Sequence, residues 1–165
     1  MNIDTDTIRR LRDGLVQSGA DTGDANSRSE VSPAHQQAAV ERFAPFAETM
    51  YLMMLVDGDA ASIELDAIRG ALQILTDGVL DETSLNDLFR HCAREVEKFG
   101  VEGRLQFVGA RLSADRVDRE TAFSLAAAVA IADNKIEDTE NALMGSIAEW
   151  YGISGKRCKE ILQHI

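Results

Sequence analysis

Two short acidic segments of the chain carry the residue types best suited to chemistry. In each, an Asp directly follows an apolar stretch, and a Glu stands seven positions further on. Carboxylate oxygens are the ligands that hard divalent cations prefer, so this pattern predicts a site for Ca²⁺, Mg²⁺ or Mn²⁺. The candidate ligands are Asp57, Glu64, Asp133 and Glu140, and Asp59 and Glu137 are candidate auxiliary ligands.

The two acidic segments belong to a longer internal repeat. Residues 51–64 match residues 127–140, and in both an apolar helix pattern leads into the Asp and then a short loop. Gly58 and Asn134 fall in register directly after the Asp. Both residue types tolerate the left-handed backbone conformation that often ends a helix. The match is therefore one of backbone geometry as well as of charge.

Helix capping is an alternative interpretation of the same carboxylates. Glu64 and Glu140 are expected near the third position of a following helix, where a Glu favours the helix dipole and can bond back to the N-cap amide. Ala61 cannot supply the side-chain half of such a capping box. Neither loop is an EF-hand, because the twelfth loop position, which requires a bidentate Glu, would be Ile68 or Met144.

The elements that would position these residues are all expected to be helices. One helix is predicted at 4–17, followed by a polar linker at 18–32, and a helical domain then fills residues 33–165. Pro33 suits a first helical turn, and Pro45 is expected to interrupt or restart that helix. Further helices are predicted at 46–56, 62–75, 82–99, 104–112, 116–132, 137–151 and after 154. The expected N-caps are Asp81 for the helix at 82–99, Asp115 or Asp118 for the helix that reaches 132, and Ser154 for the last helix. Gly100, Gly103 and Gly152 are expected to end or interrupt helices.

Composition restricts the partners. Asp and Glu total 28 against 17 Lys and Arg, which gives a net charge of −11. Such a surface repels phosphate backbones, so no nucleic-acid partner is expected, and cations or basic protein surfaces fit better. The Arg9-Arg10 and Lys156-Arg157 pairs are too small for a basic patch. The longest apolar run, 122–132, is too short to span a membrane, and residues 1–4 lack the basic and apolar regions of a signal peptide. With two isolated cysteines as well, we expect a cytoplasmic protein.

The Asp-Gly-x5-Glu hairpin, present twice in one helical chain, resembles the TerB-like family. That family includes tellurite-resistance proteins and the N-terminal domain of a membrane-bound DnaJ-type co-chaperone. The resemblance covers roughly residues 46–165. It implies a compact all-α bundle of about seven helices with two pseudo-symmetric helix-loop-helix halves, and a divalent-cation role for the paired acidic loops. The second loop departs from the pattern in having Asn134 in place of Gly.

Taken with the resemblance, the sequence predicts a non-enzymatic protein that binds a divalent cation or a protein partner in a tellurite or stress response. The alternative is a co-chaperone-type interaction scaffold in which the acidic loops only cap helices. No Ser/His/Asp or Cys/His arrangement and no Gly-rich phosphate loop is visible. The protein partner and the oligomeric state are left unspecified by the sequence.

Overall fold

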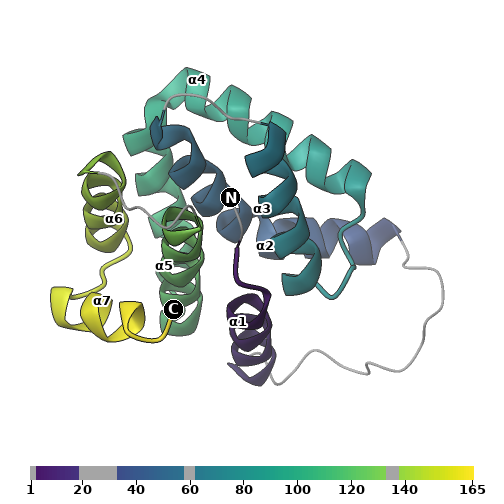
Figure 1. The fold of residues 1–165 in the computed structure, drawn as a ribbon. Coiled ribbons are helices and arrows are strands. Elements are labelled where there is room, and N and C mark those ends of the chain that lie inside the picture. Colours follow the sequence, from purple (N-terminus) through teal and green to yellow (C-terminus); the bar gives the residue numbers. More distant parts are fainter. Residues whose placement is uncertain (1–2, 19–32, 58–61, 133–137) are drawn as a thin grey trace.

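The computed structural model describes residues 3–18, 33–57, 62–132 and 138–165, and every regular element among them is helical. This confirms the predicted all-α fold of about seven helices (Figure 1). The elements are α1 (Thr5–Ser18), α2 (Pro33–Met54), the 3-10 turn η1 (Leu55–Asp57), α3 (Ser62–Leu75), α4 (Glu82–Leu112), α5 (Arg116–Ile131), α6 (Asp138–Trp150) and α7 (Gly155–Leu162).

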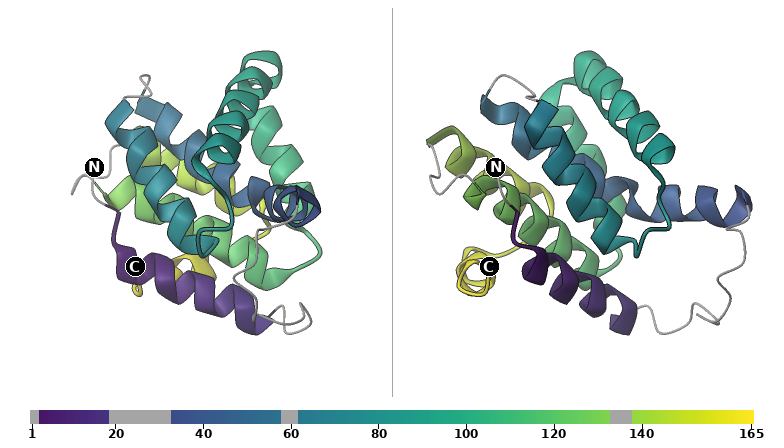
Figure 2. Two further views of the ribbon diagram at one scale, coloured as in Figure 1. Left: turned by 90° about the vertical axis from the view of Figure 1, so that its right-hand side faces the viewer. Right: turned by 45° about the vertical axis from the view of Figure 1, so that its right-hand side comes forward.

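Helices α2 and α5 form the centre of the fold. All residues from 46 to 54 of α2 and from 121 to 130 of α5 are buried, so these segments of the two helices are surrounded on every side. They pack against each other, and α4 packs against α2. Helices α1 and α3 lie together on one side, and α1 also runs alongside α5 (Figure 2). Helices α6 and α7 pack against α5 from the other side.

Three predicted helix starts and one predicted helix end are confirmed by hydrogen bonds. The side chains of Asp81, Asp115 and Ser154 each accept a hydrogen bond from an amide in the first turn of α4, α5 and α7 respectively. Gly152 follows α6 with φ of +66°, and the amide of Ile153 donates a hydrogen bond to the carbonyl of Ala148 in the last turn of α6. Local side-chain chemistry therefore sets where these helices begin and end. Of the linker predicted at 18–32, residues 19–32 lie outside the described part of the chain.

The prediction that Pro45 interrupts its helix is wrong, because α2 runs unbroken from Pro33 to Met54. Proline cannot donate to the carbonyl four residues earlier, which here belongs to Glu41. A side-chain nitrogen of Arg111, in α4, donates to that carbonyl instead, at 2.9 Å. A neighbouring helix thus supplies the hydrogen bond that the proline removes, and the helix continues.

Gly100 breaks α4 into two helical segments. Its backbone has φ of +70° and ψ of +169°, while the residues on both sides are helical. The break at Gly100 was predicted, but Gly103 lies inside the second segment, which begins directly after Gly100 and not at Arg104. Phe99 and Phe107, on either side of this bend, leave 60% and 48% of their surface exposed.

A buried ion pair joins α2 to the bend in α4. Arg104 donates two hydrogen bonds to the carboxylate of Glu48, Nε to Oε1 at 2.5 Å and Nη2 to Oε2 at 3.0 Å. Their side chains are only 6% and 4% exposed. Arg104 also donates a hydrogen bond from Nη1 to Oε2 of Glu95, at 3.2 Å. Glu95 belongs to the segment of α4 that precedes Gly100. One guanidinium therefore holds both segments of α4 against α2.

No helix in the described part of the chain is both long and apolar enough to cross a lipid bilayer.

Replacing Gly100 with Ala should destabilise the fold through backbone strain alone. A Cβ at this position would meet no atom within 4 Å, so no steric clash contributes. The conformation is one that residues other than glycine adopt at a cost of about 1–3 kcal/mol. Urea denaturation should show that loss. Gly145→Ala is the matched control, because Gly145 lies in a helix with equally open space, and it should be neutral or stabilising by about 0.5–1 kcal/mol.

Removing one partner of the buried ion pair should cost far more than removing an exposed pair. Arg104→Met leaves Glu48 buried without its cation, and we expect a loss of about 3–5 kcal/mol in unfolding free energy. The double variant Glu48→Leu/Arg104→Met should lose clearly less than the two single variants together. Arg90→Met, which breaks an exposed pair with Asp87, should cost no more than about 1 kcal/mol. Additive losses in the double variant would contradict the coupling.

Candidate functional site

The structure places the two glutamates of the acidic segments at equivalent positions. Helix α3 begins at Ser62 and α6 begins at Asp138, so Glu64 and Glu140 are each the third residue of their helix. Their predicted position near the start of a following helix is therefore correct. Glu64 is half-buried, whereas Glu140 is only 8% exposed.

The remaining predicted ligands are described incompletely or not at all. Asp57 is the last residue of η1. Asp59, Asp133 and Glu137 lie outside the described residues, as do Gly58 and Asn134. Within the described residues, no group of three or more His, Cys, Asp or Glu side chains is arranged to hold a metal ion. The metal site therefore stays a prediction.

Helix packing does bring the two acidic segments into the same part of the molecule. The turn η1, which contains Asp57, packs against α6, which carries Glu140 in its first turn. The preceding helices α2 and α5 also pack against each other. The first and second acidic segments are thus attached to neighbouring elements, although they are far apart in the sequence.

The two cysteines have the surroundings of structural thiols. Cys92 is fully buried, and this burial raises the pKa of its thiol to about 12. Cys158 is half-buried, and partial burial raises its pKa as well. A thiol is a nucleophile only as the thiolate, so neither side chain is activated for covalent chemistry.

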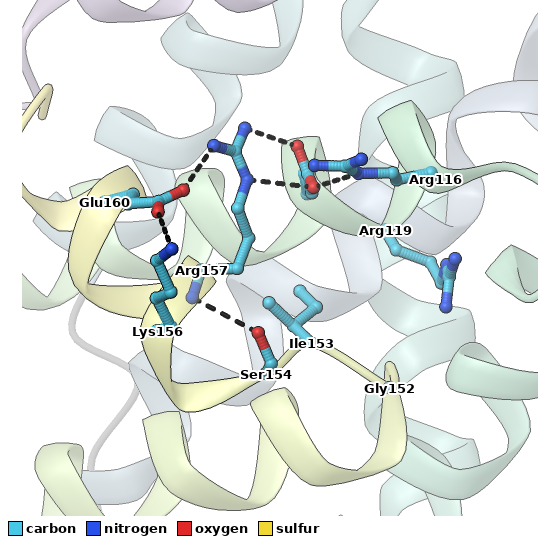
Figure 3. A pocket seen from close by; sticks show the side chains of 9 residues that line it. Arg116, Arg119, Gly152, Ile153, Ser154, Lys156, Arg157 and Glu160 are labelled. Atoms are coloured by element: carbon cyan, nitrogen blue, oxygen red, sulfur yellow. Dashed lines mark hydrogen bonds and ion pairs between the residues drawn. The ribbon is translucent and has the colours of Figure 1, made fainter.

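A second candidate site is a pocket of about 360 Å³ between α5 and α7 (Figure 3). Arg116 and Arg119 line it from α5, and Lys156 and Arg157 line it from α7. Of these four, only Lys156 and Arg157 stood out in the sequence, as a pair too small for a basic patch. The packing of α7 on α5 brings them to Arg116 and Arg119. A usable signal was their position, since all four lie in or next to the first turn of a helix, where the dipole disfavours cations.

The comparison with protein families gives one match. A family model described as "Tellurite resistance protein TerB" matches residues 28–163. The chain belongs to the TerB family. Neither the curated proteins nor the solved structures include a match. The range shared with the family model contains both acidic segments and the basic pocket, whereas α1 precedes it.

Thiol labelling should distinguish the two cysteines of this TerB-family protein. Under native conditions near pH 8, Ellman's reagent should modify Cys158 slowly, and Cys92 only as fast as the protein unfolds. In urea both thiols should react at the same rate. A Cys158→Ser variant isolates Cys92, and rapid native labelling of that variant would show that Cys92 is accessible after all.

Proposed function

We propose that this TerB-family protein is a non-enzymatic, cytoplasmic protein that binds a divalent cation through its two acidic segments as part of a tellurite or stress response. Ca²⁺, Mg²⁺ and Mn²⁺ are the ions that suit the carboxylates of Asp57, Glu64, Asp133 and Glu140. The observation that supports this most is the equivalent placement of Glu64 and Glu140, each third in a helix that follows one of the two central helices.

Helix capping alone accounts less well for these glutamates. In a reciprocal capping box, the N-cap residue contributes a Ser or Thr hydroxyl, and the Glu at the third position bonds back to it. The residue directly before α3 is Ala61, and the one before α6 is Glu137. Neither can provide that hydroxyl. At both helix starts the Ser or Thr half of a reciprocal capping box is therefore absent from the sequence.

A bound cation would act as a link between the two halves of the fold. Asp57 and Glu64 flank the connection from α2 to α3, and Asp133 and Glu140 flank the connection from α5 to α6. Because η1 packs against α6, an ion shared by both segments would join elements that are already neighbours. It would also offset the mutual repulsion of four carboxylates in a chain of net charge −11.

An interaction scaffold of the co-chaperone type is the second candidate. Phe99 and Phe107 support it, since they are 60% and 48% exposed and lie on either side of the bend in α4. Exposed aromatic side chains of this kind are typical of protein-binding surfaces. In this scaffold the carboxylates would serve only the helix dipoles, and a protein partner would bind elsewhere.

The cation proposal predicts a thermal shift. Binding to the folded state alone should stabilise it by about 2.7 kcal/mol at a hundredfold excess over the dissociation constant. For a domain of this size the unfolding midpoint should rise by roughly 5–10 °C. Differential scanning fluorimetry with Ca²⁺, Mg²⁺, Mn²⁺ and Zn²⁺ measures it, with K⁺ at matched ionic strength as the control for screening.

Variants separate specific binding from general charge effects. Asp57→Asn and Asp133→Asn should each abolish the shift while leaving the helical circular dichroism spectrum unchanged. Asp87→Asn is the matched control, because Asp87 is an exposed carboxylate on α4 that forms an ion pair with Arg90, and this variant should keep the full shift. If no divalent ion exceeds K⁺, the acidic segments are helix caps and the scaffold becomes the better proposal.

A further inference from the structure

We propose that the pocket between α5 and α7 binds a dianionic oxyanion, specifically the phosphate group of a small phosphate monoester. The proposal is independent of the cation site. The acidic segments follow the C-terminal end of α5 or lie near it, whereas this pocket lies at its N-terminal end. At 1.5 Å per residue, the two ends of α5 are roughly 22 Å apart.

The charge of the pocket is opposite to that of the whole chain. Four cations and two carboxylates line it, which leaves a local charge of +2 in a chain whose net charge is −11. Arg116 and Arg157 share the carboxylate of Glu120, and Arg157 and Lys156 share that of Glu160. Because each carboxylate serves two cations, the pocket retains positive charge that matches a dianion.

Arg157 forms the fixed wall of the pocket. It donates two hydrogen bonds to Glu120, Nε to Oε1 at 3.0 Å and Nη2 to Oε2 at 2.8 Å, and one to Glu160 at 2.9 Å (Figure 3). The bonds to Glu120, and then those to Glu160, raise the pKa of Arg157. Its guanidinium is therefore held in place and charged, so its field in the pocket is preorganised.

Three other cations have donors left for a ligand. Arg116 uses only Nε, at 2.6 Å from Glu120, and no described group accepts from its two terminal nitrogens. Arg119 is paired with no described carboxylate, and its bonds go to the main-chain oxygens of Asp115 and Tyr151 at 3.4 and 3.3 Å. The side chain of Lys156 is 89% exposed, and its nitrogen lies 3.9 Å from Glu160. Planar guanidinium groups suit the oxygens of a phosphate.

The start of α7 adds to this electrostatic preference. Its first turn contains no carboxylate that would repel an anion. The space beside Gly155 is open, since a Cβ added there would meet no atom within 4 Å. The first amides of a helix lack acceptors within it and favour an anion. The hydroxyl of Ser154 already accepts from the Arg157 amide at 3.3 Å, so the turn is fixed without using the two amides before it.

The size of the pocket indicates more than a free ion. A volume of about 360 Å³ lies within the range of sites that hold small organic molecules. A phosphate group would take the cationic part, and the body of the ester would occupy the remaining space beside Ile153. We therefore expect a monoester to bind more tightly than inorganic phosphate does.

The test is an NMR titration of the full chain with inorganic phosphate and, separately, with adenosine monophosphate, at constant ionic strength with chloride as the balancing anion. Saturable shifts are expected for the amides of residues 152–157 and for the side-chain Nε–H groups of Arg116 and Arg119. Adenosine monophosphate should give the same shifts at lower concentration. Linear, non-saturating shifts, or shifts spread over other cations, would overturn the proposal. Binding of phosphate that adenosine monophosphate does not match would overturn the assignment to a monoester.

Variants with a matched control complete the test. Arg119→Gln and Lys156→Gln should each weaken binding by about tenfold, since each removes one charge-assisted hydrogen bond. Arg90→Gln removes the same charge from a remote part of α4 and should leave the affinity unchanged. Lys156 is too exposed to affect folding, so its variant remains informative even if Arg119→Gln loses structure. Equal weakening by all three variants would show only an effect of net charge and would overturn the site.

Discussion

The buried pair of Glu48 and Arg104 is the interaction on which the rest of the structure depends. A guanidinium and a carboxylate are each almost completely removed from water, so each is stable there only because the other is present. The constraint extends beyond the pair, because Arg104 also bonds Glu95 across the break at Gly100. The direction in which α4 bends is therefore fixed relative to α2, and α2 in turn packs against α5.

This central arrangement places opposite charges at separate ends of the molecule. Residues 46–54 of α2 and 121–130 of α5 are buried, so within these segments no side chain carries exposed chemistry, which is left to the helix ends and the connections beyond them. The acidic segments follow the C-terminal ends of these two helices, and the basic pocket lies at the start of α5. An apolar core thus separates a candidate cation site from a candidate anion site, and the charges of one do not neutralise the other.

Local patterns in the sequence predicted the helices well because helix ends are set by nearby residues. Asp81, Asp115, Ser154 and Gly152 act within a few residues of where they stand. Residue type alone identified three of them, and it left Asp115 and Asp118 as alternatives for the start of α5. The error at Pro45 arose because its effect is cancelled from another helix. Nothing local to α2 shows that Arg111 will donate to the carbonyl of Glu41.

The candidate sites show the same difference between features set by nearby residues and features set by helix packing. The equivalent positions of Glu64 and Glu140 could be predicted because the repeat fixes their distance from the preceding helix. The basic pocket could not, because Arg116 and Lys156 are remote in sequence and meet only through the packing of α7 on α5. Each pair alone is an ordinary solvated surface feature. The ion pair of Glu48 and Arg104 was unpredictable for the same reason, since a buried charge has no distinct sequence pattern.

Helix α1 lies before the range that matches the family model, yet it is part of the hydrophobic core. Ile8 is completely buried, and α1 packs against α3 and α5. It also lines a cavity of about 250 Å³, which is lined as well by Glu120, Arg157 and Glu160. These three side chains also line the basic pocket, so one ion-paired network separates the two spaces. The helix outside the matched range therefore lines a cavity together with the ion-paired side chains that hold Arg157 in place.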